Sequence, residues 1–599
     1  MTGDRDIRPF VRRYYAALNS RDLVALAALI TADFQHHGSG QVAGFAAFAE
    51  TLKAFVAGFP DLEHTVAEVL VEGDRAAVRT VTSGTHLGEF LGHPPTGRSF
   101  RADALTVIRF ERNSIREIWN VFDTIQMLQQ LDLYVATAVP GSRSAPLSAA
   151  DRAHAPPASE RRPPGPARPV TLVEVRSAPL EFVSNLAATY GDIVAYECEG
   201  RLTYLLNTPD AVRHVLHDRA TNYSKLGTPD LQLLGPMLGQ GLLTTDGPIW
   251  RRDRQRLQPL FNRQRVEAFA EVIVSSTEKM LDRWTAREDP AAPLDILHEM
   301  SRLTLEIVGR ALFSSDLAAE SAEFGQAMDV VNSGMGQARS TDAGKLAGAL
   351  DLVRRTAWQM VLSRKIFDSG EDDLVSLLLE GQRLENDSDR ALADQAVTLL
   401  LAGHETTGKA LSWIFALLDR NPGAGARLAD EITEVLAGQG PTAANLPTLH
   451  YTRAVVSEAL RLYPPVWLIS RSALAPDTIE GFPVAPGTLV SMSPYLIQRH
   501  PDCWTEPLRF RPERFLETGE EAATREFRYL PFGAGPRQCI GKHFAMLELP
   551  LALAVIWQRC RLNLPLHYSL EPEALVTLRP RDGLSMTFHA RASELIVSS

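Results

Sequence analysis

The sequence predicts two folded domains, a small α+β domain followed by a larger, mainly helical domain with small β-sheets. The clearest boundary is the stretch Ala138 to Pro169, which is rich in Pro, Ala, Ser and Arg and lacks an apolar period. Such a segment buries too little surface to offset its ordering entropy, so it is typical of a flexible tether. We therefore expect domains at residues 1–137 and 169–599, joined by a linker at 138–168.

The first domain has a helical period followed by period-two patterns. Apolar residues recur at helical spacing from Ile7 to Leu18, and Asp22 is placed to cap a second helix that runs through Leu29. From His64 onward, two alternating segments surround turns near Gly73 and Asn113. These patterns indicate hairpins, and hence a curved antiparallel sheet with helices.

The second domain is mostly helical. Long amphipathic segments occupy Arg265 to Arg287, Asp295 to Leu312 and Arg390 to Leu418. Strand patterns occur at Ile193 to Leu206 and Thr488 to Met492.

Composition excludes several classes of protein. Lys and Arg number 61 against 72 Asp and Glu, and the net charge of −11 argues against a nucleic-acid partner. The four cysteines show no CxxC or Cys/His spacing, so neither a disulfide scaffold nor a structural zinc site is indicated. The charged N-terminus lacks the apolar core of a signal peptide, and no apolar run is long enough to span a membrane. We expect a cytoplasmic protein.

One cysteine lies in an unusual loop, FGAGPRQCIG, which runs from Phe532 to Gly541. Its glycines allow the backbone to wrap closely around the sulfur of Cys539, and Arg537 supplies a cation for a nearby anion. A single thiolate is a known axial ligand of haem iron. The simpler alternative is that Cys539 is a small buried apolar residue ahead of a helix.

The pattern FxxGxRxCxG resembles the cytochrome P450 family, and the likeness covers residues 169 to 599. The resemblance implies the mainly helical fold of that family, with haem b as cofactor and Cys539 as the axial thiolate. Phe532, Arg537 and Gly541 would then surround the cofactor.

Further residues follow the family's order. The stretch GPIWRRDRQRL resembles the helix in which a Trp and an Arg four residues later bind a haem propionate, here Trp250 and Arg254. Arg471 resembles another propionate ligand, although an ordinary surface arginine is an equal alternative.

A pair at ExxR spacing, Glu458 and Arg461, precedes two prolines and the segment FRPERF. By itself the spacing usually means a weak surface ion pair. The resemblance implies instead a buried network, completed by Arg514, that braces the cysteine loop.

The segment LLLAGHETTGKALSW resembles the family's oxygen-activating helix. We expect Thr406 to bond back to the carbonyl of Ala402 and so to open the helix locally. Glu405 and Thr406 match the acid–alcohol pair that delivers protons, whereas a plain polar helix face is the alternative. Ala402 and Gly403 are small enough for the helix to pass close to a flat cofactor.

The resemblance also implies partners. The substrate would be a hydrophobic small molecule that is hydroxylated or epoxidised, bound by residues 226–239, 324–348 and 466–470, where apolar residues such as Leu233 and Trp467 occur. The chain has no flavin or iron–sulfur motif, so electrons would come from a ferredoxin with its reductase, or from a flavin reductase.

The first domain, from about Asp4 to Tyr134, resembles the SnoaL-like polyketide cyclases of the nuclear-transport-factor-2-like fold. The likeness rests on YYAALNSRDL, SGTHLGEFLGHPPTGR and IREIWNVFDTIQMLQQL. Alternation would place Asp123 on one strand face with Ile115, Glu117, Trp119 and Val121. Asp123 matches the family's acid/base residue, with His86 and His37 as candidate helpers; the alternative for Asp123 is a helix cap.

Three hypotheses follow. The first is a bifunctional biosynthetic enzyme whose haem domain oxidises a metabolite and whose first domain catalyses an acid/base cyclisation, isomerisation or epoxide opening. The second keeps the monooxygenase but makes the first domain a non-catalytic dimerisation or carrier-docking module. The third is a haem enzyme that uses peroxide or isomerises its substrate without an external reductase.

Overall fold

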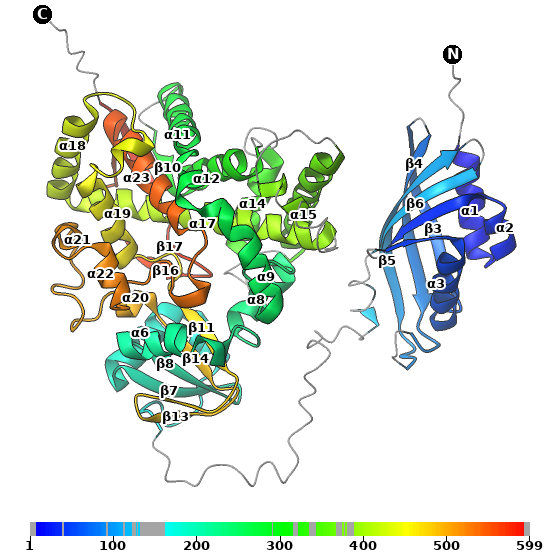
Figure 1. Ribbon diagram of the computed structural model, residues 1–599, viewed down its shortest axis with the longest axis horizontal. Coiled ribbons are helices and arrows are strands. Elements are labelled where there is room, and N and C mark those ends of the chain that lie inside the picture. Colours follow the sequence, from blue (N-terminus) through cyan, green and yellow to red (C-terminus); the bar gives the residue numbers. More distant parts are fainter. Residues whose placement is uncertain are drawn as a thin grey trace, which may run out of the picture. The chain divides into compact units, whose positions relative to one another are not determined.

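In the computed structural model the chain forms two compact units, residues 1–156 and 157–599 (Figure 1). The structure describes residues 7–38, 41–72, 74–90, 94–111, 114–122, 127, 130–131, 162–289, 292–314, 322–334, 343–366, 374–376, 378–379 and 389–591. Each unit is described by itself.

The first unit packs helices on one face of a six-stranded sheet (Figure 1). The strand order is β2-β1-β6-β5-β4-β3. Most pairs are antiparallel as expected, but β1 pairs in parallel with β6, the last strand of the sheet in the chain. The elements are α1 (Arg8–Asn19), α2 (Leu23–Ala27), α3 (Phe45–Gly58), β1 (Ile30–Gly38), β2 (Gln41–Ala43), β3 (Glu63–Glu72), β4 (Arg75–Thr85), β5 (Ser99–Glu111) and β6 (Ser114–Phe122).

The predicted helix cap is confirmed. The Asp22 carboxylate accepts hydrogen bonds from the N–H groups of Val24 and Ala25, at 3.0 and 2.9 Å. These bonds satisfy two of the donors that every helix start leaves unpaired.

The expected alternation along β6 is wrong at its start. Arg109 pairs with Glu117, but the next residue, Phe110, pairs with Ile115, so one extra residue bulges from β6. A bulge shifts the side chains that follow it to the other face. Ile115 therefore shares the buried, helix-covered face with Ile118 rather than with Glu117 and Trp119.

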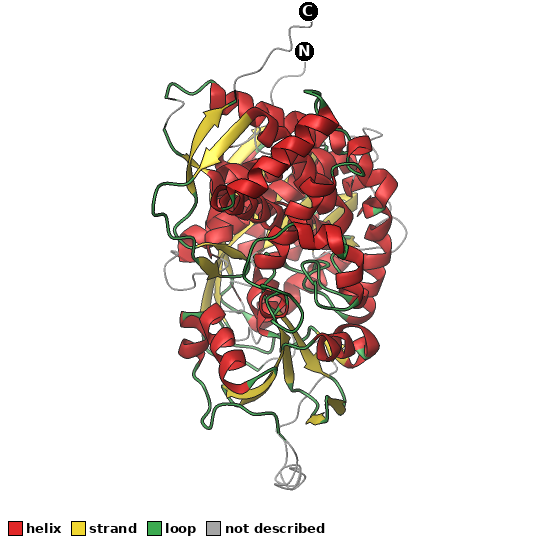
Figure 2. Ribbon diagram, turned by 90° about the vertical axis from the view of Figure 1, so that its left-hand side faces the viewer, coloured by secondary structure: helices red, strands yellow, loops and turns green. Residues whose placement is uncertain are grey.

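The second unit is helical with small sheets at its edges (Figure 2). Its helices are α5 (Leu172–Ser177), α6 (Pro179–Tyr190), α7 (Pro209–Arg213), α8 (Pro229–Leu238), α9 (Gly247–Leu257), α10 (Arg263–Glu267), α11 (Ala270–Thr285), α12 (Ile296–Phe313), α14 (Ala322–Gly334), α15 (Ala343–Ile366), α17 (Asp389–Arg420), α18 (Pro422–Leu436), α19 (His450–Leu462), α20 (Pro494–Ile497), α21 (Glu513–Glu517), α22 (Glu520–Arg525) and α23 (Lys542–Arg559).

Its strands form one five-stranded sheet, in the order β7-β8-β14-β11-β9, and smaller sheets. The strands are β7 (Ile193–Cys198), β8 (Arg201–Leu206), β9 (Tyr223–Ser224), β10 (Leu294–Asp295), β11 (Ile469–Ala473), β12 (Asp477–Ile479), β13 (Phe482–Val484), β14 (Leu489–Met492), β15 (Cys560–Asn563), β16 (Pro572–Ala574), β17 (Leu578–Pro580) and β18 (Ser585–Ala590).

The second unit begins before Pro169. The carbonyl of Pro164 accepts a hydrogen bond of 2.9 Å from the N–H of Ala195 in β7. A Cβ at Gly165 would meet the Ala195 carbonyl oxygen at 1.8 Å, so only glycine permits this approach. Residues 162–168, which the composition placed in the linker, thus pack against this unit.

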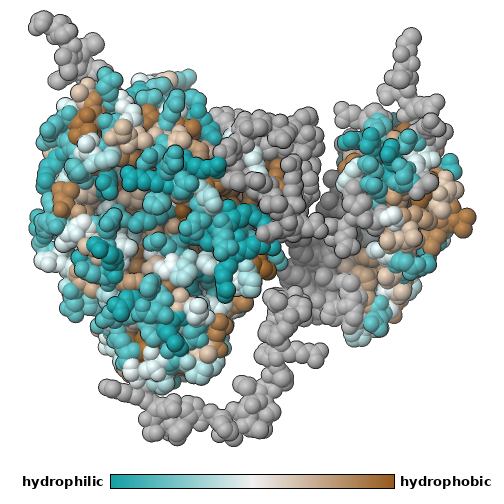
Figure 3. Space-filling view, in the orientation of Figure 1, coloured by the Kyte–Doolittle hydropathy of each residue, from teal (hydrophilic) through white to brown (hydrophobic). Residues whose placement is uncertain are grey.

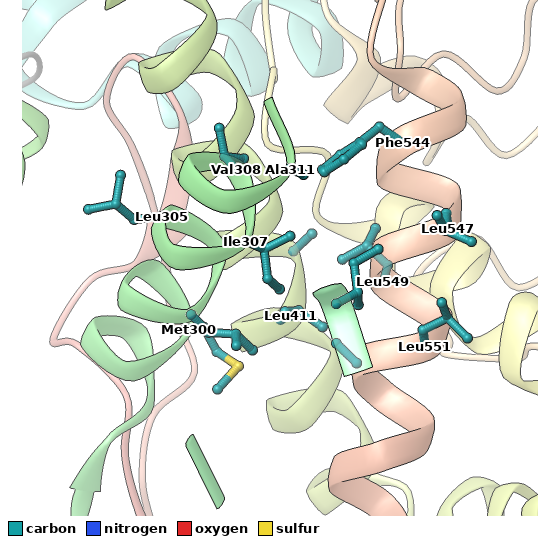
Figure 4. Close-up of a cluster of buried hydrophobic side chains, with 14 of the residues drawn as sticks. Met300, Leu305, Ile307, Val308, Ala311, Leu411, Phe544, Leu547, Leu549 and Leu551 are labelled. Atoms are coloured by element: carbon teal, nitrogen blue, oxygen red, sulfur yellow. The ribbon is translucent and has the colours of Figure 1, made fainter. Parts of the chain in front are cut away.

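The core of the second unit lies where α12, α17 and α23 pack together. Their apolar side chains interdigitate there, among them Ile307, Leu411 and Leu549 (Figure 4). α23 begins directly after the cysteine loop, so this core fixes the direction in which the chain leaves the loop.

The visible face of the second unit is mostly hydrophilic, whereas apolar side chains show on the α2 side of the first unit (Figure 3). Val24 in α2 is 80% exposed. Within the described part of the chain, every helix is too short or too polar to cross a membrane.

Candidate active site

The cysteine loop is held by its own backbone and by glycines. The N–H of Cys539 donates to the carbonyl of Phe532 at 2.9 Å, which closes the loop. Gly533 and Gly535 have positive φ angles of 64° and 70°. A Cβ at Gly535 would lie 1.7 Å from the carbonyl oxygen of Leu216, so this glycine is required by both conformation and space.

Cys539 is exposed as a residue, although many protein atoms lie around its thiol. Burial raises the pKa of its thiol, while the N–H of Gly541 and the charges of Arg254 and Lys542 lower it. A metal would favour the thiolate further, because only the deprotonated sulfur binds it. The buried-hydrophobe alternative fits Cys560, which is fully buried, better than Cys539.

Basic side chains gather at the loop as expected. Arg254 donates from Nη1 to the carbonyl of Gln538 at 2.9 Å. The guanidinium of Arg537 lies 4.3 Å from the ring centre of Trp250 and pairs with Asp246. Trp250 and Arg254, four residues apart on α9, therefore both reach this loop.

Arg471 is buried in β11, so the surface alternative is wrong. Burial, followed by the charge of Arg537, lowers its pKa to about 10. Lys225, which the sequence analysis missed, is also buried, and burial lowers its pKa to about 8. Asp230 and Asp246 are the acids that act on both cations.

This set fits haem on two grounds. The thiol of Cys539 is open to a ligand, and Arg471, Arg537 and Lys225 outnumber the two acids beside them. Buried cations are stabilised by anions close by, and haem carries two carboxylates.

The network expected around Glu458 is present and buried. Arg461 donates to both oxygens of Glu458, at 2.7 and 2.9 Å, and Arg514 donates to one of them at 3.0 Å. Glu458 and Arg461 are fully buried and Arg514 nearly so. The weak surface pair is therefore excluded at this site.

The network reaches the cysteine loop through a residue that the sequence analysis missed. Gln498 accepts from the N–H of Leu530 at 2.6 Å, and its amide donates to the carbonyl of Arg461 at 2.9 Å. Leu530 stands two residues before Phe532, so Gln498 joins the two parts. Its signal in the sequence is faint, because a lone glutamine far from both motifs has no distinctive spacing.

On α17, the hydroxyl of Thr406 donates to the carbonyl of Ala402 at 2.8 Å, which confirms the expected bond. The side chain of Glu405 contacts two residues other than Thr406 and Ala402. Its buried carboxylate forms an ion pair with Lys409 and accepts a hydrogen bond of 2.8 Å from Thr577. The structure thus gives Glu405 and Thr406 separate partners.

Lys409 was missed, although its i+4 spacing from Glu405 is readable in the sequence. Burial lowers its pKa, whereas Glu405 opposes that shift. Lys409 also donates to Thr577, which lies between β16 and β17.

Gly403 lies where α17 packs against α12. A Cβ there would lie 3.1 Å from Val308, so its small size lets α17 pack closely on α12. Ala402 is exposed, so it lies on the side of α17 that other protein atoms leave uncovered.

The expected substrate-binding segments are partly structural. Trp467 is buried, and its indole N–H donates to the carbonyl of Leu575 at 2.8 Å. Leu226 and Leu233 remain 51% and 44% exposed and are available to line a binding space. Residues 335–342 of the expected segment 324–348 lie outside the described residues.

In the first unit, Asp123 and the side chain of His37 lie outside the described residues. His86 is buried, and its Nδ1 accepts a hydrogen bond of 3.2 Å from the N–H of Thr96. Its ring lies 5.4 Å from that of Phe59, so these contacts are those of a structural residue.

Comparison with known proteins agrees with both parts of this description. Residues 163–586 match the family model of cytochrome P450, and residues 9–131 match that of the SnoaL-like polyketide cyclases. Cyclooctatin synthase of Streptomyces melanosporofaciens is 38% identical over 425 residues, which cover 68% of this chain and 89% of that protein.

Two further relatives have names that state an oxidation. Cyclooctat-9-en-7-ol 5-monooxygenase of Streptomyces melanosporofaciens is 32% identical and covers 64% of this chain and 85% of its own length. Pentalenene oxygenase of Streptomyces avermitilis is 31% identical and covers 69% of this chain and 93% of its own length. The cysteine loop and the buried glutamate–arginine network agree with these matches. The chain therefore belongs to the cytochrome P450 family of monooxygenases and carries a SnoaL-like domain at its N-terminal end.

Proposed function

We propose that the second unit binds haem b through the thiolate of Cys539 and inserts one oxygen atom from dioxygen into a hydrophobic small molecule. Bound haem supplies the activation of dioxygen. The observation that carries the proposal is the exposed residue Cys539 in a loop closed by Phe532 and flanked by buried cations.

Residues in and around the loop would hold the cofactor and balance its charge. Arg471 and Arg537 would neutralise the haem carboxylates, and Trp250 stacks on Arg537 and keeps its guanidinium in place. Arg254 and the N–H of Gly541 favour the anionic form of the sulfur. Glu458, Arg461 and Arg514 act only by supporting the loop.

Protons for the reaction come from α17. The Thr406 hydroxyl donates to the carbonyl of Ala402. In the interior, Glu405 would relay protons together with Lys409 and Thr577. Because burial lowers the pKa of Lys409, its ammonium releases a proton more readily than an exposed lysine would.

The substrate is an unsaturated hydrocarbon or alcohol that is hydroxylated or epoxidised. The relatives support this class, since two of their names state oxidation of an "-ene" and of an "-en-ol". Membership of the P450 family implies an electron donor, which we assign to a ferredoxin with its reductase or to a flavin reductase. We place the protein in the cytoplasm.

The test is product analysis of the full chain with an unsaturated terpene hydrocarbon, surrogate redox proteins and ¹⁸O-labelled dioxygen. We expect one labelled oxygen atom in the product, dependent on the reductase, and none with Cys539→Ser. Turnover with peroxide alone, without any response to the reductase, would favour a peroxide-using or isomerising enzyme instead.

For the first unit we propose an acid/base cyclisation, isomerisation or epoxide opening with Asp123 as the acid/base residue. The SnoaL-like match over residues 9–131 supports it. Asp123→Asn should leave the oxidation intact and change the final product. An unchanged product would favour the alternative, in which the first unit is a dimerisation or carrier-docking module. Sedimentation of the full chain, compared with a chain starting at residue 162, would detect dimerisation through the first unit.

A further inference from the structure

A π-helical turn of the second unit lies against the cysteine loop. After α7, residues His214–Asp218 form one wide turn, in which the N–H of Arg219 donates to the carbonyl of His214 at 2.8 Å. Val215 and Leu216, in the middle of the turn, are buried. Turns of this kind are rare in proteins and occur frequently at functional sites.

The cysteine loop rests on this turn at Gly535. A Cβ on Gly535 would lie 1.7 Å from the carbonyl oxygen of Leu216 and 3.6 Å from the Cα of His217, so the two backbones are in direct contact. The carbonyl of Gly535 accepts a hydrogen bond of 3.0 Å from the N–H of Gln538, the residue before Cys539. A shift of the turn would therefore pass through one glycine and one hydrogen bond to the backbone beside Cys539.

The first residue of the turn is tied to a strand far along the chain. Nε2 of His214 lies 2.9 Å from Oδ2 of Asp477, at the start of β12. A carboxylate only accepts hydrogen bonds, so the Nε2 of His214 is the donor. Leu216 of the turn, Ile479 of β12 and Ala534 of the cysteine loop belong to one apolar core. The turn, the strand and the loop thus pack as one group.

The pair of His214 and Asp477 differs from an ordinary surface pair. The side chain of Asp477 is 8% exposed, and its carboxylate also accepts from the hydroxyl of Tyr223 at 2.8 Å and from the N–H of Thr478 at 2.9 Å. Burial by itself raises the pKa of Asp477, but the hydrogen bonds from His214, Thr478 and Tyr223 outweigh burial and lower it. At pH 7 the group is therefore a carboxylate held by three donors, and it holds His214 in turn.

We propose that His214 and Asp477 are positioning residues for Cys539. Their hydrogen bond fixes the π-helical turn on which the cysteine loop rests, and so keeps the sulfur in one position. The Glu458 network reaches the chain before Phe532, through Gln498, whereas His214 acts on the part of the loop after Phe532. The effect on the iron ligand rests on the proposed function of the second unit, but the effect on the loop does not.

Hydrogen exchange of the full-length protein tests the effect on the loop. The N–H groups of Gln538 and Cys539 close the loop, and a peptide that spans residues 532–541 reports their protection. We expect His214→Leu to lower this protection by about 3- to 10-fold. Loss of a hydrogen bond to a charged group is worth about tenfold or more, and part of that reaches the loop.

Two variants are the controls for exchange. His214→Gln retains a side-chain N–H that can donate to Asp477, so it should restore the wild-type protection. Arg213→Ala removes an exposed pair with Asp218 at the same end of α7, and it should leave the protection unchanged.

The ferrous carbonyl spectrum tests the effect on the iron ligand. We expect the thiolate band of His214→Leu to convert to a band at shorter wavelength about 3- to 10-fold faster than in the wild type, and His214→Gln to behave as the wild type. Ile432→Val removes one methylene group from the core of the second unit, at the buried side of α18, and destabilises the unit at a site outside the turn. It should leave the conversion rate unchanged, which separates positioning from a general loss of stability.

Wild-type protection in His214→Leu would overturn the proposal, as would equal losses in His214→Gln, Arg213→Ala or Ile432→Val. If His214→Leu fails to fold, Tyr223→Phe decides, because it removes another donor from the same carboxylate. Lower protection of the loop is then expected, and unchanged protection would contradict the proposal. A wild-type protein without the thiolate band would refute haem ligation by Cys539, and the exchange measurements would still decide the role of His214.

Discussion

Nη1 of Arg254 donates a hydrogen bond of 2.9 Å to the carbonyl of Gln538, the residue before Cys539. The bond joins α9 to a loop 284 residues further along the chain. It places a permanent cation beside the sulfur, where that cation lowers the pKa of a thiol that burial otherwise raises. Arg254 therefore opposes part of the upward shift that burial causes in the pKa of Cys539.

The Glu458 network should be essential for stability. Arg461→Ala would leave the fully buried carboxylate of Glu458 with one partner fewer, at a cost of about 3–5 kcal/mol. Urea unfolding followed by circular dichroism measures this. Arg511→Ala is the matched control, because its side chain pairs with the exposed Glu517 and solvent screens that pair, so the loss should be much smaller. Equal losses in the two variants would contradict the account.

Gly535→Ala should disrupt the cysteine loop. The new Cβ would overlap the carbonyl oxygen of Leu216, at a positive φ that alanine disfavours, and overpacking alone costs about 1–3 kcal/mol. We expect less haem per protein in absorbance spectra of the purified variant. Gly423→Ala, where the added Cβ meets open space in α18, should retain haem as the wild type does. Full haem content in Gly535→Ala would contradict this prediction, because it would mean that the loop can move away from Leu216 and still bind haem.

Lys409 and Glu405 should be coupled. Lys409→Met leaves a buried carboxylate without its cation and should destabilise the second unit by about 3–5 kcal/mol. Adding Glu405→Gln removes that charge, so the double variant should be more stable than Lys409→Met alone. A double-mutant cycle measured by urea unfolding checks this. Strictly additive losses would mean that the ion pair has no role in stability.

The first unit should lose stability in mild acid through His64. Its pKa is about 4 in the folded state and near 6.5 when unfolded, so the unfolded chain binds more protons between these values. Stability is therefore complete above about pH 6.5 and falls as the pH is lowered towards 4, by up to about 1.4 kcal/mol per pH unit.

Hydrogen exchange of the β3 and β4 peptides, measured from pH 7 to pH 4.5, tests this expectation. Protection corrected for intrinsic rates should fall more steeply in the wild type than in His64→Gln, which cannot titrate. Parallel slopes in the two proteins would rule out His64 as the cause.

The sequence predicted those features that depend on short spacing. Glu458 and Arg461 stand three residues apart on one helix, and the cysteine loop is a continuous decapeptide, so their geometry follows from local structure. The bulge in β6 could not be predicted from the sequence. The alternation of residue types continues through it, whereas the pairing with β5 shifts by one residue.

Long-range partners were equally hidden. Gln498 and Thr577 meet their targets 32 and 172 residues away, and His64 meets Thr82 across a hairpin. Each is a common polar residue without a distinctive neighbour, so only the folded chain shows which groups they contact. Lys409 is the exception, since its position four residues after Glu405 could have been noticed.

The central claim is that the sulfur of Cys539 binds haem iron, and the ferrous carbonyl spectrum of the purified full-length protein tests it most directly. The account predicts the strongly red-shifted absorbance band of thiolate ligation, lost in Cys539→Ser and kept in Cys503→Ser. A protein that binds haem without that band, or keeps it in Cys539→Ser, would contradict the account.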